Sequence, residues 1–494
     1  MSTLSVVETR SGKVQGTRNE QVSVWKGIPF AQPPIGPLRF RAPKPVDAWI
    51  GVRDATQFGA IAPQTEMGSF GTLREPMSED CLTLNVWSPS ADDARRPVMV
   101  WIHGGSFVTG SGSTPWYDGT GFATHGDVVV VTINYRLGAL GFLYLAEIGG
   151  EEYVTSGNNG LLDQIAALTW VRDNIAAFGG DPDNVTVFGE SAGAMSIGAL
   201  LAISDAHGLF KRAILQSGAA HRVNSSHIAA TAAKNFLNAL TLAGPNAIQQ
   251  LLTTPVDAIL KAQNTLASSV QLRAFSPVID GVVLSKRSID AIADGSAAGI
   301  DVLIGTNLDE MKLFTVFDPR QQNVDTAILT TLFGDRADNI LGIYTEHQQE
   351  TPLSTPWEAF LTDRTFRIPA IRLAEQQVKH GTSVWMYRFD WPTPVYGSVL
   401  GACHALEIPF VFDTLRQPSV SMLTGGASAP QPIANAMHAA WIAFARNGDL
   451  SQVEGLPAWP PYNVEQRATM LFNLENTINN DPQSEIRKIW EGIL

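Results

Sequence analysis

One short segment, residues 185–201, constrains the fold of this chain more than any other. It begins with the apolar run Val-Thr-Val-Phe, passes through the turn Gly-Glu-Ser-Ala-Gly and then becomes rich in helix-forming residues. This order predicts a strand, a sharp turn and a helix, with Ser191 at the tip of the turn. Gly189 and Gly193 permit the turn, because a side chain at either position would collide across it. The pattern indicates a serine nucleophile, although an ordinary glycine-rich turn can carry the same five residues.

Strands and helices alternate around this segment. The expected elements are, in chain order, strands at 98–102 and 128–134, a helix at 161–175, strands at 185–188, 212–216, 301–307 and 383–389, and a helix at 433–446. This alternation favours an α/β fold in which helices cover a mostly parallel sheet. Reactive groups collect at the carboxyl ends of the strands in such sheets. We expect one domain over residues 1–494, with helical insertions at about 225–300 and 315–380.

Composition excludes several classes of protein. The chain has 494 residues, of which 45% are hydrophobic and 16% charged, so it can bury a large core. The net charge of −13 opposes binding to nucleic acid. No segment reaches the roughly 20 apolar residues of a membrane span, and the first residues lack the pattern of a secretion signal. We therefore expect a cytoplasmic protein, monomeric or weakly self-associating, that needs no metal or organic cofactor.

The strand at 98–102 leads directly into His-Gly-Gly-Ser-Phe at residues 103–107. Glycines in such a loop let main-chain N–H groups approach a reacting carbonyl, whose oxygen becomes negative when a nucleophile attacks it. We assign these oxyanion donors to Gly105 and Ser106, with Ala192, the residue after the nucleophile, as the third. The alternative is a simple glycine turn after a strand.

A serine nucleophile also needs a base and an acid, which follow it in the chain order typical of such sheets. Four histidines lie late enough, and only His404 lies on a glycine-bordered loop; the others are His347 in a polar run, His380 at a helix end and His438 within a helix. The strand at 301–307 leads into Asp309 and Glu310, either of which could orient the imidazole. Spacing alone leaves the choice between them open.

These residues resemble the type-B carboxylesterase family, which includes cholinesterases and, as the most similar subgroup, bacterial para-nitrobenzyl esterases. The resemblance extends over nearly the whole chain, and its motifs lie at residues 178–193, 79–87, 134–138 and 404–412. It implies an α/β-hydrolase fold with Ser191, Glu310 and His404 as the triad. From the acidic charge and the aromatic residues available for a pocket, we expect hydrolysis of small to medium uncharged aryl or alkyl esters through an acyl-enzyme. The same triad would serve an amidase, a carbamate hydrolase or a lipase. A non-catalytic adhesion or scaffold protein on this fold is a remote alternative, since such relatives generally lose the nucleophile.

The chain departs from the family pattern at three places. Ser106 stands where many relatives have a third glycine, and Met311 follows the acid where many have glycine. Cys81 resembles one half of a family disulfide, but its expected partner falls near Ala62. With Cys403 as the one other cysteine, we expect no disulfide, which fits a reducing compartment.

The substrate pocket is less well defined by the sequence. Phe107, Trp116 and Phe275 are candidates for its wall. Glu190, beside the nucleophile, resembles an acid that lies near a cationic substrate in cholinesterases, although a hydrogen-bonded structural carboxylate is the reading we favour. Ser217, after the strand at 212–216, resembles a supporting hydroxyl near the acid.

Overall fold

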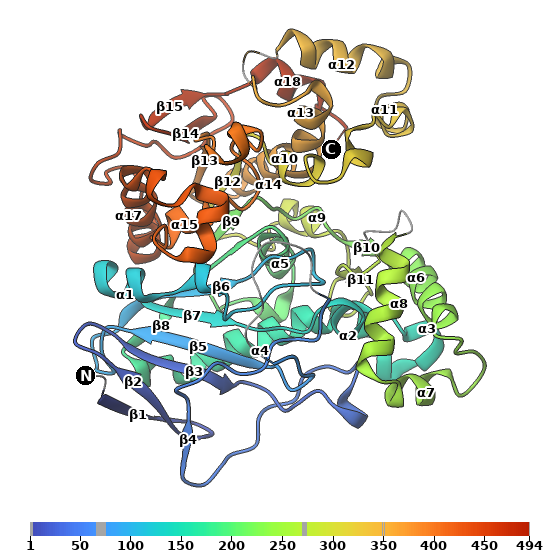
Figure 1. Ribbon diagram of the computed structural model, residues 1–494, viewed down its shortest axis with the longest axis vertical. Helices are drawn as coiled ribbons and strands as arrows, with labels where there is room; N and C mark the ends of the chain where they lie inside the picture. The colour runs from blue at the N-terminus through green and yellow to red at the C-terminus, as the bar shows by residue number, and fades with distance from the viewer. Residues whose placement is uncertain (1–2, 66–75, 269–273, 348, 350, 494) are drawn as a thin grey trace. The chain divides into compact units, whose positions relative to one another are not determined.

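The computed structural model describes residues 3–65, 76–268, 274–347, 349 and 351–493 (Figure 1). Residues 269–273 lie within the first predicted insertion, and residues 348 and 350 within the second, so these parts of both predictions fall outside the described residues. The chain divides into two compact units, residues 1–213 with 220–297 and residues 214–219 with 298–494. The expectation of one domain stays a prediction.

The first unit contains a sheet in the order β1-β2-β3-β5-β7-β6-β8, with β4 paired to β2. Its strands are β1 (Thr3–Thr9), β2 (Gly12–Arg18), β3 (Ser23–Pro29), β4 (Val52–Asp54), β5 (Thr83–Ser88), β6 (Arg96–Ile102), β7 (Val129–Ile133) and β8 (Gly180–Glu190). β6 is parallel to both β7 and β8, whereas the strands from β1 to β5 pair antiparallel along the main path. Every residue of β7 is buried, as expected for a central strand.

Helices flank this sheet. They are α1 (Thr120–Gly126), α2 (Gly138–Phe142), α3 (Ala146–Gly149), α4 (Asn159–Asn174), α5 (Ala192–Leu200), α6 (Ser226–Ala239), α7 (Ala247–Thr253), α8 (Val256–Ser268) and α9 (Ser288–Ala293). α4 and α5 pack against β8, and α1 packs against β5 and β7. The predicted insertion at 225–300 consists mainly of α6 to α9, with the short parallel pair β10 (Asn224–Ser225) and β11 (Val278–Ile279).

The second unit contains strands in the order β9-β12-β13-β14-β15. They are β9 (Arg212–Gln216), which belongs to this unit from Ile214 onward, β12 (Asp301–Asn307), β13 (Val384–Phe389), β14 (Ala468–Phe472) and β15 (Thr477–Asn480). β12, β13 and β14 are parallel, and β15 closes the edge antiparallel to β14. The helices are α10 (Lys312–Thr315), α11 (Thr326–Phe333), α12 (Ala337–Glu346), α13 (Pro356–Thr362), α14 (Ile368–Lys379), α15 (Ile408–Val411), α16 (Ser421–Thr424), α17 (Gln431–Asn447) and α18 (Ser484–Ile489).

Most predicted elements lie where the pattern placed them, and the boundary of one strand is a correction. The strand before Ser191 was expected at 185–188, but β8 begins at Gly180. The preceding residues Asp-Pro-Asp-Asn are typical of turns, and they lie in the register shift between the pair Gly180–Arg96 and the pair Val185–Val98. The pairing of Gly180 with Arg96 is what places the start of β8 ahead of the predicted one.

Candidate active site

Ser191 forms the junction between β8 and α5. β8 ends at Glu190 and α5 begins at Ala192, so a single residue makes the turn. Its backbone has φ 53° and ψ −120°, a conformation that non-glycine residues rarely adopt and that costs about 1–3 kcal/mol. A β-carbon at Gly193 would lie 1.9 Å from the Ile102 carbonyl oxygen, so this position requires glycine. The local fold thus stores strain at the predicted nucleophile.

The loop that follows β6 lies against this turn. A β-carbon added to Gly104 would lie 3.1 Å from Ser191 Cβ, so the two backbones are in close contact. Gly105 has φ 110°, and its carbonyl oxygen accepts hydrogen bonds from the N–H groups of Val108 and Thr109, each at 3.0 Å. These bonds fix the carbonyl, and with it the peptide planes of the loop.

Three main-chain donors remain available at this junction. Across the described part of the chain, the N–H groups of Gly105, Ser106 and Ala192 have no hydrogen-bond acceptor. Ser106 replaces the third glycine of many relatives, yet it adopts φ 56°, so the loop keeps a left-handed turn there. Donors that are fixed and unpaired are what stabilisation of an oxyanion requires.

His103 and Tyr135 pack together at the start of this loop. The two rings stack with centroids 4.5 Å apart, and the Tyr135 hydroxyl donates to the His103 carbonyl oxygen at 2.8 Å. Burial lowers the pKa of His103 to about 4, so its ring is neutral at neutral pH. A buried neutral ring holds the loop without adding positive charge beside the predicted oxyanion donors.

Glu190 lies between the two parts of this junction. It is 4% exposed, and a β-carbon on Gly104 would lie 2.7 Å from its Oε2 atom. The pKa of Tyr135 is raised, first by burial of its hydroxyl and second by the negative charge of Glu190. Whether Glu190 contacts substrate or is a structural carboxylate stays a prediction.

The predicted acid and base are in direct contact within the second unit. Glu310 Oε2 lies 2.6 Å from His404 Nδ1, and Glu310 Oε1 accepts the Asn307 N–H at 2.8 Å. Glu310 is fully buried and His404 is 5% exposed. The rings of Phe314 and Phe366 lie 5.2 and 4.8 Å from the imidazole centroid and confine it. This geometry suits a carboxylate that orients the imidazole and stabilises its protonated form.

Asp309, the other acid that spacing left open, has different partners. Its carboxylate accepts the Ser354 hydroxyl at 2.6 Å and the Ala402 N–H at 3.0 Å. Burial raises the pKa of Asp309. It therefore ties the loop after β12 to the loop before His404. Met311, where many relatives have glycine, has an ordinary helical φ of −71°, and its N–H donates to Thr362 Oγ1 at 3.2 Å.

The other late histidines lie where the sequence placed them. His380 follows the end of α14 and is exposed, and His438 lies within α17 with Nδ1 2.8 Å from the Val411 carbonyl oxygen. His347 follows the end of α12, with Nδ1 2.9 Å from the Ile343 carbonyl oxygen. Neither Glu310 nor Asp309 bonds any of these three in the described residues.

The aromatic residues proposed for a pocket wall are buried within the first unit. Phe107 packs edge-on against Phe142 at 5.1 Å, and Phe275 packs against Phe236 at 6.0 Å. Trp116 is 6% exposed. Their role as substrate contacts stays a prediction.

Sequence analysis missed three polar residues of the hydrogen-bond network behind the acid, namely Gln216, Asn307 and Glu407. Each is buried, and their hydrogen bonds join the ends of β9 and β12 to the His404 loop. No spacing rule points to them, because their side chains act on other protein groups. The one available signal was the presence of polar residues at the ends of apolar strands.

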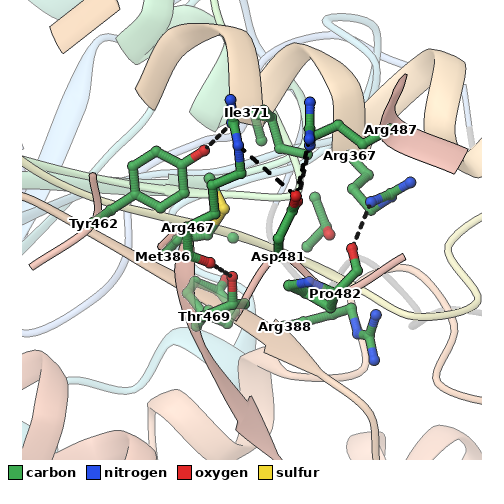
Figure 2. Close-up of a pocket in the computed structure, with 14 residues that line it drawn as sticks. Arg367, Ile371, Met386, Arg388, Tyr462, Arg467, Thr469, Asp481, Pro482 and Arg487 are labelled. Atoms are coloured by element: carbon green, nitrogen blue, oxygen red, sulfur yellow. Dashed lines mark hydrogen bonds and ion pairs between the residues drawn. The ribbon is translucent and has the colours of Figure 1, made fainter. Parts of the chain in front are cut away.

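A pocket lined by arginines lies in the second unit and contains none of the predicted site residues (Figure 2). Its empty volume is roughly 400 Å³, which includes space open to solvent, and Arg367, Arg388, Arg467 and Arg487 line it. Each guanidinium is neutralised by a carboxylate; the pairs are Arg367–Asp363, Arg388–Asp390, Arg467–Glu375 and Arg487–Asp481. We interpret this cluster as a structural ion-pair network that anchors the C-terminal strands and α18.

Comparison with known proteins decides the family. The model of the carboxylesterase family matches residues 3–490. The para-nitrobenzyl esterase of Bacillus subtilis is 43% identical over 98% of each chain, and the phenmedipham hydrolase of Pseudarthrobacter oxydans is 37% identical over 96% of each. A crystal structure of a Geobacillus stearothermophilus carboxylesterase superposes with a TM-score of 0.89 at 45% identity, covering 98% of this chain and 99% of that one.

The chain belongs to the carboxylesterase family. It has the α/β-hydrolase fold and is a serine carboxylic ester hydrolase. The resemblance found in the sequence motifs is therefore confirmed, as are the predicted fold class and enzyme class. Both cysteines are free, and no disulfide joins them.

Two further features concern the described residues alone. No helix there is both long enough and apolar enough to cross a bilayer. No three His, Cys, Asp or Glu side chains are placed there so that they could hold a metal ion.

Proposed function

We propose that this carboxylesterase hydrolyses small to medium uncharged aryl or alkyl esters with Ser191 as nucleophile, His404 as base and Glu310 as the orienting acid. The observation that carries the proposal is the strained turn of Ser191 beside three main-chain N–H groups that have no acceptor among the described residues. The 2.6 Å contact between Glu310 and His404 supports the other half of the triad.

The proposed reaction has two steps. His404 takes the proton from Ser191, and the serine oxygen attacks the ester carbonyl carbon. The negative oxygen of the resulting intermediate accepts hydrogen bonds from Gly105, Ser106 and Ala192. The alcohol leaves with the proton from His404, and water then attacks the acyl-enzyme by the same route.

The similarity to para-nitrobenzyl esterase supports uncharged aryl esters as substrates. The net charge of −13 also opposes anionic substrates, and Phe107, Trp116 and Phe275 would supply apolar walls. We further propose that residues 1–494 act as one catalytic domain, monomeric or weakly self-associating, in the cytoplasm. Two buried free thiols support a reducing location.

Substitution of Ser191 tests the mechanism. Ser191→Ala should lower kcat for a para-nitrophenyl ester by on the order of 10⁶, since the nucleophile is lost. Ser204→Ala, which changes an exposed serine of the same unit, should leave kcat unchanged. A fluorophosphonate label, mapped by mass spectrometry, should modify the Ser191 peptide of the wild type only. Activity of Ser191→Ala within about tenfold of wild type would contradict the assignment.

The same machinery could cleave other acyl compounds, and the leaving group decides between them. Para-nitrophenyl esters of increasing acyl length should show a steep decline beyond short chains. A maximum at long chains would identify a lipase instead. Turnover of the matched anilide comparable to that of the ester would identify an amidase, and of a matched carbamate a carbamate hydrolase.

A further inference from the structure

We propose that Glu407, a buried carboxylate outside the triad, is a positioning residue that locks Glu310 in place through Asn307 and holds negative charge near His404. This inference rests on the proposed function, because it assigns a role behind the same acid and base. It adds a second carboxylate whose charge helps to set the pH range in which the base works.

Asn307 connects the acid to Glu407. Its backbone N–H donates to Glu310 Oε1 at 2.8 Å, while its side-chain Nδ2 donates to Glu407 Oε2 and to the Cys403 carbonyl oxygen, both at 2.7 Å. A carbonyl oxygen can only accept, so the amide nitrogen of Asn307 must face Cys403. Its second N–H then points at Glu407. One residue at the end of β12 therefore holds both the acid and the loop that carries the base.

The second oxygen of Glu407 is also engaged. Gln216 Nε2 donates to Glu407 Oε1 at 3.0 Å, and Trp441 Nε1 donates to Gln216 Oε1 at 2.9 Å. An indole N–H can only donate, so Gln216 must present its oxygen to Trp441 and its N–H group to Glu407. Both carboxylate oxygens thus accept hydrogen bonds. A proton on either oxygen would face an N–H donor, so the network fits the ionised form of Glu407.

Ionisation of Glu407 is costly in this site, so the presence of a carboxylate here indicates that its charge has a role. Glu407 and Glu310 are both fully buried, and burial followed by the charge of Glu310 raises the pKa of Glu407. The two amide donors act in the opposite direction. The groups that act on Glu407 are Glu310 after β12, His404 on its own loop and the neutral amides of Asn307 and Gln216. Further out, Glu407 and Asp309 both act on Cys403, and His438 on α17 bonds the Val411 carbonyl.

His404 is the group in this set whose positive charge the reaction needs. A buried negative charge nearby stabilises the imidazolium that forms when the base takes the serine proton. Without the charge of Glu407, the imidazolium is less stable and the free base persists to lower pH. The acidic limb of the pH profile of kcat/KM, where protonation of the base removes activity, should then move to lower pH.

Two variants separate charge from shape. In Glu407→Gln the acidic limb should move down by roughly half a pH unit or more, because one buried charge is removed. Glu407→Asp keeps the charge but shortens the side chain, so kcat should fall by about tenfold while the limb stays within about 0.2 unit. The matched control is Glu375→Gln, which removes a carboxylate from the ion pairs with Arg372 and Arg467 in the same unit. The control should lower the free energy of unfolding without moving the acidic limb of the pH profile.

A double variant answers the risk that Glu407→Gln does not fold. In Glu407→Gln combined with Gln216→Glu, the new carboxylate can accept from Trp441 and from the new amide, whose oxygen accepts from Asn307. Every hydrogen bond is retained, while the negative charge moves from position 407 on the His404 loop to position 216 at the end of β9. Since the charge is no longer on that loop, the limb should again lie below that of wild type.

The outcomes separate the two proposals. Fluorophosphonate labelling of Ser191 in the wild type, together with a lowered limb in the folded variants, supports the role of Glu407. Labelling of Ser191 with the limb of both variants within about 0.2 unit of wild type overturns that role and leaves the triad intact. If the wild type is not labelled at Ser191, the proposed function fails first.

Discussion

Replacement of Gly105 by alanine tests the oxyanion loop directly. Gly105 has φ 110°, which L-amino acids rarely adopt, and an added β-carbon would lie 2.1 Å from the Thr109 carbonyl oxygen. Real β-carbons stay at least about 3.0 Å from such atoms, so the backbone would have to open by about 0.9 Å. The obstacle is backbone rather than a flexible side chain, and Thr109 in turn donates to the Gly105 carbonyl oxygen. The shift must therefore move the peptide planes that carry the donors.

Two magnitudes follow from this displacement. Loss of one oxyanion donor lowers kcat by about 10² to 10³, and Gly105→Ala disturbs the N–H groups of both Gly105 and Ser106. We expect the decrease to appear in kcat rather than KM, because the donors act on charge that develops during the reaction. The unfavourable backbone conformation should also lower the free energy of unfolding by at least about 1–2 kcal/mol.

Gly208→Ala is the matched control. Gly208 has φ 79°, and no atom lies within 4 Å of an added β-carbon. It should lose a similar amount of stability, about 1–2 kcal/mol, and keep its kcat. The assay is kcat and KM for a para-nitrophenyl ester, with urea unfolding followed by circular dichroism. Folded Gly105→Ala enzyme with kcat within about threefold of wild type would refute the assignment of this loop.

Two further predictions concern buried titratable groups. His103 binds a proton below about pH 6.5 in the unfolded chain but only below about 4 when folded, so its contribution to stability is lost as pH falls through this window. Between about pH 7.5 and about pH 4.5, the free energy of unfolding in urea should therefore fall by about 2.5 kcal/mol less for His103→Asn than for wild type. Equal decreases would contradict the burial argument. Cys81 and Cys403 are fully buried and burial raises the pKa of both thiols, so a thiol reagent should modify neither in the native protein and both in urea. Rapid native labelling at either would show that its surroundings open.

The predictable parts of this protein are those that backbone periodicity and local chemistry encode. The elements β9 and β12 match their expected ranges because short apolar runs between turn residues leave few alternatives. The Ser191 turn was predictable because so tight a turn needs small neighbours, and the sequence has them at Gly189 and Gly193. The start of β8 was not, because Gly180 joins the strand through its pairing with Arg96 of β6, across a register shift that contains Asp-Pro-Asp-Asn.

The choice between Asp309 and Glu310 shows where sequence reasoning ends. The two carboxylates are adjacent, both are nearly or fully buried, and composition treats them alike. Their partners distinguish them: Asp309 binds Ser354 and the Ala402 N–H, whereas Glu310 binds His404. These partners come from positions 45 to 94 residues away, so neither propensity nor spacing carries the information. Family resemblance pointed to Glu310, and the hydrogen bonds now give a physical reason for that choice.

The residues behind Glu310 extend this argument. Asn307, Gln216 and Glu407 have no reactive group directed at a substrate, so no motif marks them. Their value lies in directionality: a carbonyl that only accepts and an indole that only donates fix the orientation of both amides, and those amides favour an ionised Glu407. A neutral, well-packed residue in place of Glu407 would avoid the cost of burying charge. Since the site keeps the charge beside a base that must become positive, electrostatic support of that base is the physical role we assign to it.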